Sequence, residues 1–324
     1  MTPEFSLIDR FFKRAAVVPG RAVLGIGDDC ALIRATPNCE LAISTDTLVS
    51  GTHFFADADA EKLGHKALAV NLSDLAAMGA TPRYVTLALT LPNIDEAWLA
   101  AFSRGFFALA DAYRLELIGG DTTRGPLSIT LTILGEVAAG RALRRDGAKA
   151  GDDIWVSGSL GGAALALMHL QTQVTLPMPI FGAVEACLHQ PNPRIQLGQA
   201  LLGIATAAID ISDGLLADLG HICERSQLAA AVDHAAVPMV PALRTAAAGV
   251  RDSCALVSGD DYELCFTASS AQRERIHALG KTLILPLTRI GTMLAPEGSM
   301  ARVSVFDAQR RDVTPSAAGY DQFA

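Results

Sequence analysis

The chain has 324 residues and a formal net charge of −8 at pH 7; half of its residues are hydrophobic and 19% are charged. Its length exceeds the usual limit of one hydrophobic core and predicts two domains, while the acidic balance argues against a nucleic acid or an anionic membrane as the main partner. No apolar run approaches the roughly 20 residues of a membrane span. The cysteines lack metal-ligand spacing and the N-terminus lacks a secretory apolar core, so a cytoplasmic protein with reduced thiols is expected.

Two short apolar runs near the N-terminus each end in acidic residues. Residues 22–26 and 41–44 have the length and β-branched content of buried strands. Asp28 and Asp29 follow the first run, and Asp46 follows the second. A carboxylate beside a buried strand is costly unless it is paired, hydrogen-bonded or bound to a metal, so these acids indicate a cation site. The alternative is ordinary turn chemistry, in which Asp after Gly tightens a loop.

The next predicted element is a helix over residues 61–80 that Gly79 closes. Asn71 and Asp74 are three residues apart and therefore share one face of this helix. Their surroundings are so apolar that Asp74 needs a partner, although a solvated carboxylate on a polar stripe remains the alternative.

The rest of the first half predicts a strand, a helix and two further strands, over 84–92, 95–113, 115–120 and 128–137. Asp95 is the expected N-cap of the helix. The second of these strands runs into Asp121 and Thr122, which repeats the earlier order of strand, glycine, acid and hydroxyl.

A change in composition marks the domain boundary. Residues 138–152 contain bases and glycines without a clear period, so we place the boundary at 148, with domains 1–148 and 149–324. The bases form either a solvated linker face or a set of phosphate contacts. They are Arg141, Arg144, Arg145 and Lys149.

The second half opens with a strand over 153–158, a glycine-rich turn and a helix. Such a turn can offer backbone N–H groups to a phosphate, although it matches neither common nucleotide-loop pattern. A later apolar run ends in Asp210 and is followed by Asp213. Ser212 or Asp213 either joins a cation site or caps the next helix. Three more acids stand at the entrance of a further strand: Asp260, Asp261 and Glu263.

Five acids from five separate segments point to one kind of chemistry: Asp29, Asp46, Asp74, Asp121 and Asp210. Oxygen ligands suit Mg²⁺, which binds through a few carboxylates together with substrate phosphates. No two histidines have the i, i+4 spacing of a helical metal pair, and no nucleophilic triad stands out.

Six segments together resemble the thiamine-monophosphate kinase family. In chain order they are GIGDDCA at 25–31, ISTDTLVSGTHF at 43–54, KALAVNLSDLAAMGA at 66–80, LIGGDTTRGP at 117–126, AIDISDGL at 208–215 and DYELCFT at 261–267. The matches run in order across nearly the whole chain, up to GYDQF at 319–323.

The resemblance implies a two-domain α/β (α+β) fold like that of aminoimidazole ribonucleotide synthetase, in which the N-terminal strands of two subunits pack together in a homodimer. It also implies ATP-dependent phosphorylation of thiamine monophosphate to thiamine diphosphate with several Mg²⁺ ions, the last step of thiamine diphosphate biosynthesis. By motif, the implied Mg²⁺ ligands are Asp29, Ser44, Thr45, Asp46, Asp74, Asp121, Asp210 and Asp213.

The resemblance further implies which residues contact the two substrates. Those expected along ATP are Gly120, Asp121, Arg145 and Ser212. Those expected against thiamine monophosphate are His53, Asp260 and Tyr320. The family usually has Glu where this chain has Asp260, so the shorter side chain changes that contact.

Elementary chemistry agrees with direct transfer between phosphates. A phosphate monoester has its second pKa near 6 and is largely ionised at neutral pH, so it needs in-line positioning rather than a general base. We therefore expect no phosphoenzyme and no catalytic side chain beyond the metal ligands. Two alternatives stay open: another ATP-using enzyme of the same superfamily, and a non-catalytic sensor of nucleotides or thiamine phosphates.

Overall fold

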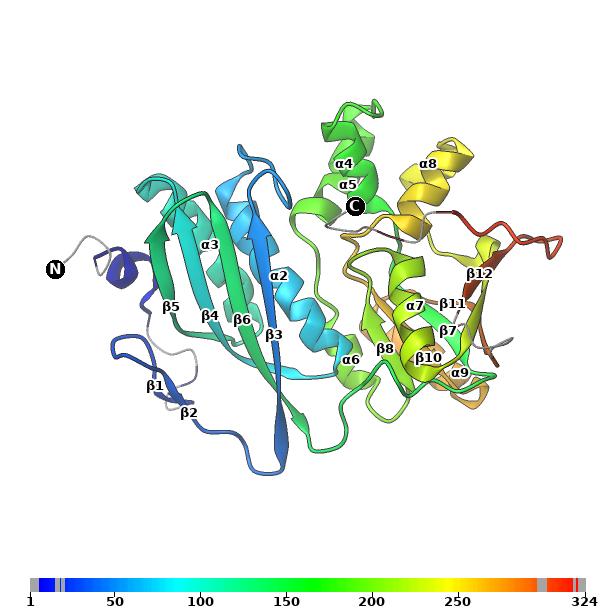
Figure 1. Ribbon diagram of the computed structural model, residues 1–324, viewed down its shortest axis with the longest axis horizontal. Helices are drawn as coiled ribbons and strands as arrows, with labels where there is room; N and C mark the ends of the chain where they lie inside the picture. The colour runs from blue at the N-terminus through cyan, green and yellow to red at the C-terminus, as the bar shows by residue number, and fades with distance from the viewer. Residues whose placement is uncertain (1–5, 15–17, 19–20, 296–301, 317–318, 320–324) are drawn as a thin grey trace. The chain divides into compact units, whose positions relative to one another are not determined.

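A computed structural model describes residues 6–14, 18, 21–295, 302–316 and 319 of the chain. The chain divides into two compact units (Figure 1). The first comprises Met1–Leu75 and Ala80–Gly140, and the second comprises Ala76–Gly79 and Arg141–Ala324. Tyr320, expected against thiamine monophosphate, lies outside the described residues.

The first unit is built on a four-stranded sheet of order β3-β6-β4-β5. The central strand β6 is antiparallel to both of its neighbours, and β5 is parallel to β4. The strands are β3 (Cys39–Val49), β4 (Thr81–Leu91), β5 (Glu116–Arg124) and β6 (Ser128–Ala138). A π-helical turn and a small hairpin precede them, formed by Ile8–Phe12, β1 (Ala22–Leu24) and β2 (Leu32–Ile33).

Two helices, α2 (Ala60–Ala77) and α3 (Glu96–Ala112), cover one face of this sheet (Figure 1). They approach closely at Gly105, which has no side chain: a Cβ added there would lie 1.8 Å from the carbonyl oxygen of Glu61. The carboxylate of Asp95 accepts hydrogen bonds from the N–H groups of Ala97 and Trp98, so the predicted cap is confirmed.

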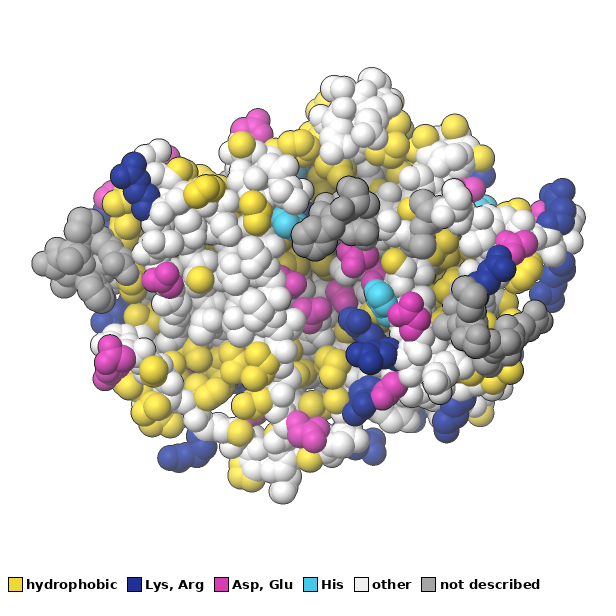
Figure 2. Space-filling model, in the orientation of Figure 1, with side chains coloured by type: hydrophobic (Ala, Val, Ile, Leu, Met, Phe, Trp, Pro, Cys, Tyr) yellow, Lys and Arg dark blue, Asp and Glu magenta, His cyan; other side chains and the backbone are white. Residues whose placement is uncertain are grey.

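The other face of the first sheet carries exposed side chains. Ile43 is 60% exposed there, and pairs of threonine hydroxyls, such as Thr47 with Thr130 at 2.9 Å, join neighbouring strands. Figure 2 shows this face, with hydrophobic side chains gathered over part of the sheet.

The second unit holds a six-stranded sheet of order β12-β9-β11-β7-β10-β8, in which only the β12–β9 pair is parallel. The strands are β7 (Asp153–Ser157), β8 (Ala207–Asp210), β9 (Ala229–Asp233), β10 (Leu264–Ala268), β11 (Leu287–Leu294) and β12 (Val303–Phe306). The helices are α4 (Gly162–Leu170), α5 (Met178–His189), α6 (Ile195–Ala200), α7 (Leu215–Ser226), α8 (Ala248–Asp252) and α9 (Arg273–Leu283). Short helical turns occupy His234–Ala236, Pro241–Thr245, Ser253–Val257 and Ser270–Gln272.

The core of the second unit occupies both faces of its sheet. Ile154, Val156 and Ile209 belong to one buried cluster together with residues of α4 and α7. Trp155 and Phe266, from neighbouring strands, are fully buried and stack with ring centroids 6.3 Å apart. The predicted mixed α/β fold is confirmed. Within the described residues, no helix is long and apolar enough to cross a membrane.

Candidate functional site

Two carboxylates meet between β3 and α2 in the first unit. The Ser44 hydroxyl donates a hydrogen bond to the carboxylate of Asp74. Ser44 and Asp46 are two residues apart on β3, so their side chains point to the same face of the strand, the one that the helices cover. Burial, and then the nearby charge of Asp74, raise the pKa of Asp46 to about 7. Each effect disfavours two ionised carboxylates, and a bound cation would reverse both.

Asn71, one helical turn before Asp74, adds an oxygen to the same region. Its side-chain nitrogen donates to the carbonyl oxygen of Ala67 at 3.0 Å, which fixes the orientation of the amide. Its Oδ1 is buried and has no hydrogen-bond partner among the described residues. Carboxylate, hydroxyl and amide oxygens are the kinds of donor that Mg²⁺ prefers.

The sheet register separates two other expected ligands from this pair. Thr45 points to the opposite face of β3, where its hydroxyl lies 2.9 Å from that of Thr132. Gly120 occupies the same cross-strand row as Asp46, three strand spacings away, and Asp121 is the next residue along β5. At roughly 4.8 Å per spacing, Asp121 lies about 14 Å from Asp46 along the sheet.

The remaining expected residues of the first unit lie in turns. Asp29 is exposed, and its N–H donates to the carboxylate of Asp28 at 2.9 Å. The Nδ1 of His53 accepts a hydrogen bond from the N–H of Val49 at 3.0 Å, which leaves Nε2 as the nitrogen that carries a proton in the neutral ring. Among the described residues, no three Asp, Glu, His or Cys side chains converge in a metal-binding cluster.

In the second unit, the turn after β8 is bonded along its length to the segment that enters β10. The N–H of Asp260 donates to the carbonyl oxygen of Ser212 at 2.9 Å, and Ile211 and Tyr262 are joined at 2.8 Å. Asp210, which is buried, pairs with Leu264 in the sheet. The structure therefore brings the expected residues Asp210, Ser212 and Asp260 into one part of this unit.

Asp213 has charged neighbours from three segments. Burial raises the pKa of its carboxylate; the charges of His221 and Arg145 lower it, and that of Asp260 raises it. The charge of Arg145 therefore reaches the carboxylate of Asp213 in the turn after β8. His221, on α7, did not stand out in the sequence because a single histidine on an amphipathic helix has no distinguishing pattern.

Asp260 and Tyr262 both adopt left-handed backbone conformations, with φ of 68° and 49°. This conformation is uncommon for residues other than glycine and persists where the surroundings fix it. The hydroxyl of Tyr262 donates to the Asp260 carboxylate at 2.9 Å. The aspartate that replaces the family's glutamate is therefore held by its own loop.

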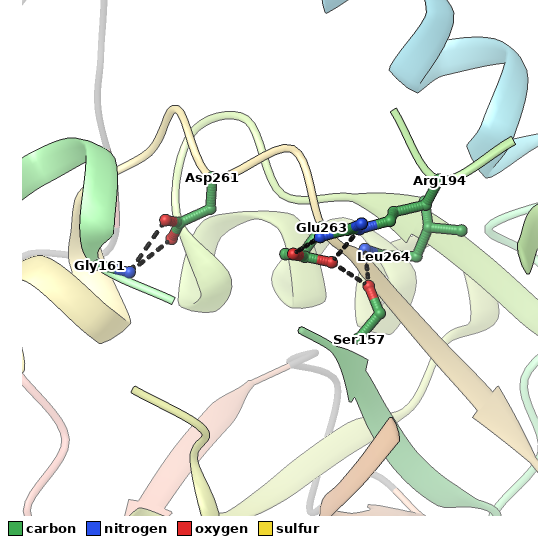
Figure 3. A network of polar contacts seen from close by, with 6 residues as sticks. All are labelled: Ser157, Gly161, Arg194, Asp261, Glu263 and Leu264. Carbon is green, nitrogen blue, oxygen red and sulfur yellow. Dashed lines mark hydrogen bonds and ion pairs between the residues drawn. The ribbon is translucent and has the colours of Figure 1, made fainter. Parts of the chain in front are cut away.

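The two acids beside Tyr262 have structural partners (Figure 3). Glu263 is buried and receives a two-pronged ion pair from Arg194, with Nε 2.7 Å from Oε2, together with a hydrogen bond from the hydroxyl of Ser157. Asp261 accepts a hydrogen bond from the N–H of Gly161 at 2.9 Å, and burial raises the pKa of Asp261 well above its usual value. The glycine-rich turn was expected to offer backbone N–H groups to a phosphate. Its Gly161 N–H is instead bonded to the carboxylate of Asp261.

Asp218 was missed by sequence reasoning. It lies in the first turn of α7, and one carboxylate oxygen accepts hydrogen bonds from the N–H groups of Ser212, Asp213 and Gly214. Burial raises its pKa to about 6, while these hydrogen bonds oppose that shift. The N-cap of α7 is Gly214, so the alternative that Ser212 or Asp213 caps this helix is wrong.

Comparisons with known proteins agree with this architecture. Residues 27–137 match the model for the N-terminal domain of AIR synthase related proteins, and residues 149–303 match the model for their C-terminal domain. The chain is 50% identical to the thiamine-monophosphate kinase of Salmonella typhimurium, over 99% of this chain and 98% of that protein. It is 48% identical to the Escherichia coli K12 enzyme over the same shares.

Solved structures show the same likeness. The crystal structure of thiamine-monophosphate kinase from Stenotrophomonas maltophilia has a TM-score of 0.85 and 50% identity, covering 93% of this chain and 96% of that one. The complex named AaThiL with AMPPCP and TMP has a TM-score of 0.76 and 28% identity, covering 89% of each chain. Because these matches span both units, the chain belongs to the thiamine-monophosphate kinase family of AIR synthase related proteins.

Proposed function

We propose that this chain transfers the γ-phosphoryl group of ATP to thiamine monophosphate and so completes the synthesis of thiamine diphosphate. Its whole-length identity to thiamine-monophosphate kinases supports the reaction, and a relative in complex with AMPPCP, an ATP analogue, and TMP supports the substrates. The observation in this chain that carries the proposal is the Asp46–Asp74 pair with its hydroxyl and amide oxygens. Such a donor set is suited to Mg²⁺ that carries phosphates.

Mg²⁺ is held, in this proposal, by the oxygen ligands expected from the sequence. Ser44, Asp46 and Asp74 supply one group of donors in the first unit, and Asp210 and Asp213 supply another in the second. Asp29, Thr45 and Asp121 complete the set at separate positions. When bound, Mg²⁺ neutralises phosphate oxygens that would otherwise repel each other.

The chain's other residues orient the two substrates. Gly120, Asp121, Arg145 and Ser212 contact ATP in this proposal, and His53, Asp260 and Tyr320 contact thiamine monophosphate. The acceptor phosphate is already ionised at neutral pH, so no residue has to remove a proton from it. The transfer is direct and in line, and its rate depends on positioning and on charge neutralisation.

The open face of the first sheet supports a homodimer. Ile43 and Leu41 of β3 are exposed, and Figure 2 shows hydrophobic side chains gathered over part of this face. Burying such a face against a second copy removes apolar surface from water.

Ile43→Arg is expected to convert the dimer to a monomer, because the interface would then bury an unpaired charge. Light scattering coupled to gel filtration measures the mass. Ile94→Arg is the matched control: Ile94 is 58% exposed, close to the 60% of Ile43, and precedes α3 instead of lying on the sheet. A wild-type protein that stays monomeric at tens of micromolar would contradict the proposed dimer.

The reaction is tested by incubating the protein with ATP, thiamine monophosphate and Mg²⁺ and by following both products by chromatography. We expect equal amounts of ADP and thiamine diphosphate, and neither product without Mg²⁺. ADP without thiamine diphosphate would indicate another acceptor, and intact ATP would indicate a sensor. Label from γ-³²P-ATP that stays on the protein during turnover would contradict direct transfer.

A further inference from the structure

One buried carboxylate holds the turn that carries Ser212 and Asp213. The Oδ2 of Asp218 accepts three hydrogen bonds, from the N–H groups of Ser212 at 3.0 Å, Asp213 at 3.1 Å and Gly214 at 3.1 Å. Asp218 is only 3% exposed, so these bonds are shielded from water and matter more than surface bonds would.

The geometry of α7 explains why the cap comes from inside the helix. Its N-cap, Gly214, has φ of +117°, and a Cβ there would lie 2.1 Å from the carbonyl oxygen of Val257. A serine, threonine or aspartate therefore does not fit at the position from which helix N-termini are usually capped. Asp218, four residues later, instead accepts hydrogen bonds from the N–H of the N-cap Gly214 and from those of the two residues before it.

Contacts on both sides then fix the turn. The N–H of Ser212 is bonded to Asp218, and its carbonyl oxygen accepts from the N–H of Asp260 at 2.9 Å. A Cβ added to Gly259 would lie 1.8 Å from that carbonyl oxygen, so the two segments are in direct contact. The side chains of Ser212 and Asp213 stay partly exposed above this anchored backbone.

The same contacts restrict how the turn can bind a nucleotide. Consecutive backbone N–H groups at a helix N-terminus commonly bind phosphate. Here Asp218 already uses the three N–H groups of the turn. These three N–H groups are therefore not available to a phosphate, and a ligand that contacts Ser212 or Asp213 meets side chains whose orientation depends on Asp218.

We propose that Asp218 is a positioning residue that orients Ser212 and Asp213 for their contacts with ATP and Mg²⁺. It touches neither ligand and acts through the backbone of the turn. The inference rests on the proposed function, because the roles of Ser212 and Asp213 belong to that proposal.

The test compares Asp218→Ala, which removes the acceptor, with Asp218→Asn, which keeps one acceptor oxygen. MgADP affinity is measured by calorimetry and thermal unfolding by fluorescence, with binding recorded below the lowest melting temperature. We expect Asp218→Ala to weaken MgADP binding roughly 10- to 100-fold, the usual effect of removing a residue that orients a metal ligand. Asp218→Asn is expected to recover most of this affinity.

Asp153→Asn is the matched control. Asp153, on β7, is also a buried carboxylate of the second unit, at 1% exposure. It forms ion pairs with Arg273 at 2.6 Å and with Arg289 at 2.5 Å. This variant is expected to melt earlier while it binds MgADP like the wild type. Its behaviour separates a general loss of stability from a displaced turn.

Asp218→Ala that melts earlier but binds MgADP within twofold of the wild type would overturn the inference and leave Asp218 as a helix cap alone. The proposed function is judged separately, by whether the wild type forms thiamine diphosphate. A wild type that binds MgADP without forming this product would fail as a kinase, and the comparison of variants would still decide what Asp218 does.

Discussion

Asp46→Asn is expected to lower turnover about 100-fold or more while it stabilises the metal-free protein above pH 7. The loss follows because the variant removes one of two carboxylates that face each other between β3 and α2, and charge neutralisation of this kind supplies factors of about 10² to 10³. Turnover at saturating ATP and thiamine monophosphate measures this effect.

The gain in stability follows from the raised pKa of Asp46. In the folded state this pKa is about 7, against an ordinary value of 3.8, so the folded protein binds the proton more tightly than the unfolded chain. The stability linked to Asp46 is complete below pH 3.8 and is lost as the pH rises through 7. The asparagine variant does not titrate and avoids this loss, which amounts to about 4 kcal/mol above pH 7.

Urea unfolding in EDTA between pH 5 and pH 8.5 measures the difference, and repeating it with Mg²⁺ should stabilise the wild type far more than the variant. Glu40→Gln, on the same strand, is the control, since Glu40 is exposed and accepts from the N–H of Gly140. Equal stabilisation of wild type and Asp46→Asn by Mg²⁺ would remove Asp46 from the metal ligands.

Arg194→Ala is expected to destabilise the second unit by about 3 to 5 kcal/mol, because it leaves the buried carboxylate of Glu263 without its counter-ion. The side chains of Arg194 and Glu263 are only 19% and 7% exposed. Adding Glu263→Gln should recover part of the loss, since the buried charge rather than the missing contact dominates it. The urea midpoint of each variant measures these changes.

Arg144→Ala is the matched control for this ion pair. Arg144 makes the same two-pronged contact with Asp146, at 2.8 Å and 2.6 Å, but on the surface. Water and salt screen such a pair, so the urea midpoint should hardly change. Arg194→Ala with no larger effect than Arg144→Ala would show that Glu263 is not held as a buried charge.

Local signals in the sequence predicted most of the elements. The cap at Asp95, the acid-tipped strand at Asp210 and the shared helix face of Asn71 and Asp74 depend on residues near each other in the chain, and periodicity reveals these. The mixed α/β fold follows from the same signals, and its assignment to the family came from motifs in chain order.

Contacts between distant residues were not predictable in this way. Arg194 and Glu263 are 69 positions apart. Nothing in the segment PNPR at 191–194 marks its arginine as the partner of a glutamate beside a later strand. The sequence also shows that the side chains of Thr45 and Asp46 point to opposite faces of their strand, but it does not show which of these faces a helix covers. Capping by Asp218 depends on the crowding of Gly214 by Val257, which only the folded chain reveals.

The close approach of two glycines to neighbouring carbonyl groups has a dynamic consequence. Gly214 lies against Val257 and Gly259 lies against Ser212, so neither the turn after β8 nor the segment before β10 has room to move alone. Their amide hydrogens should exchange with solvent through one shared opening, at a common rate, instead of fraying residue by residue. A ligand that binds either segment would then slow exchange in both, and would bind to a surface already shaped before it arrives.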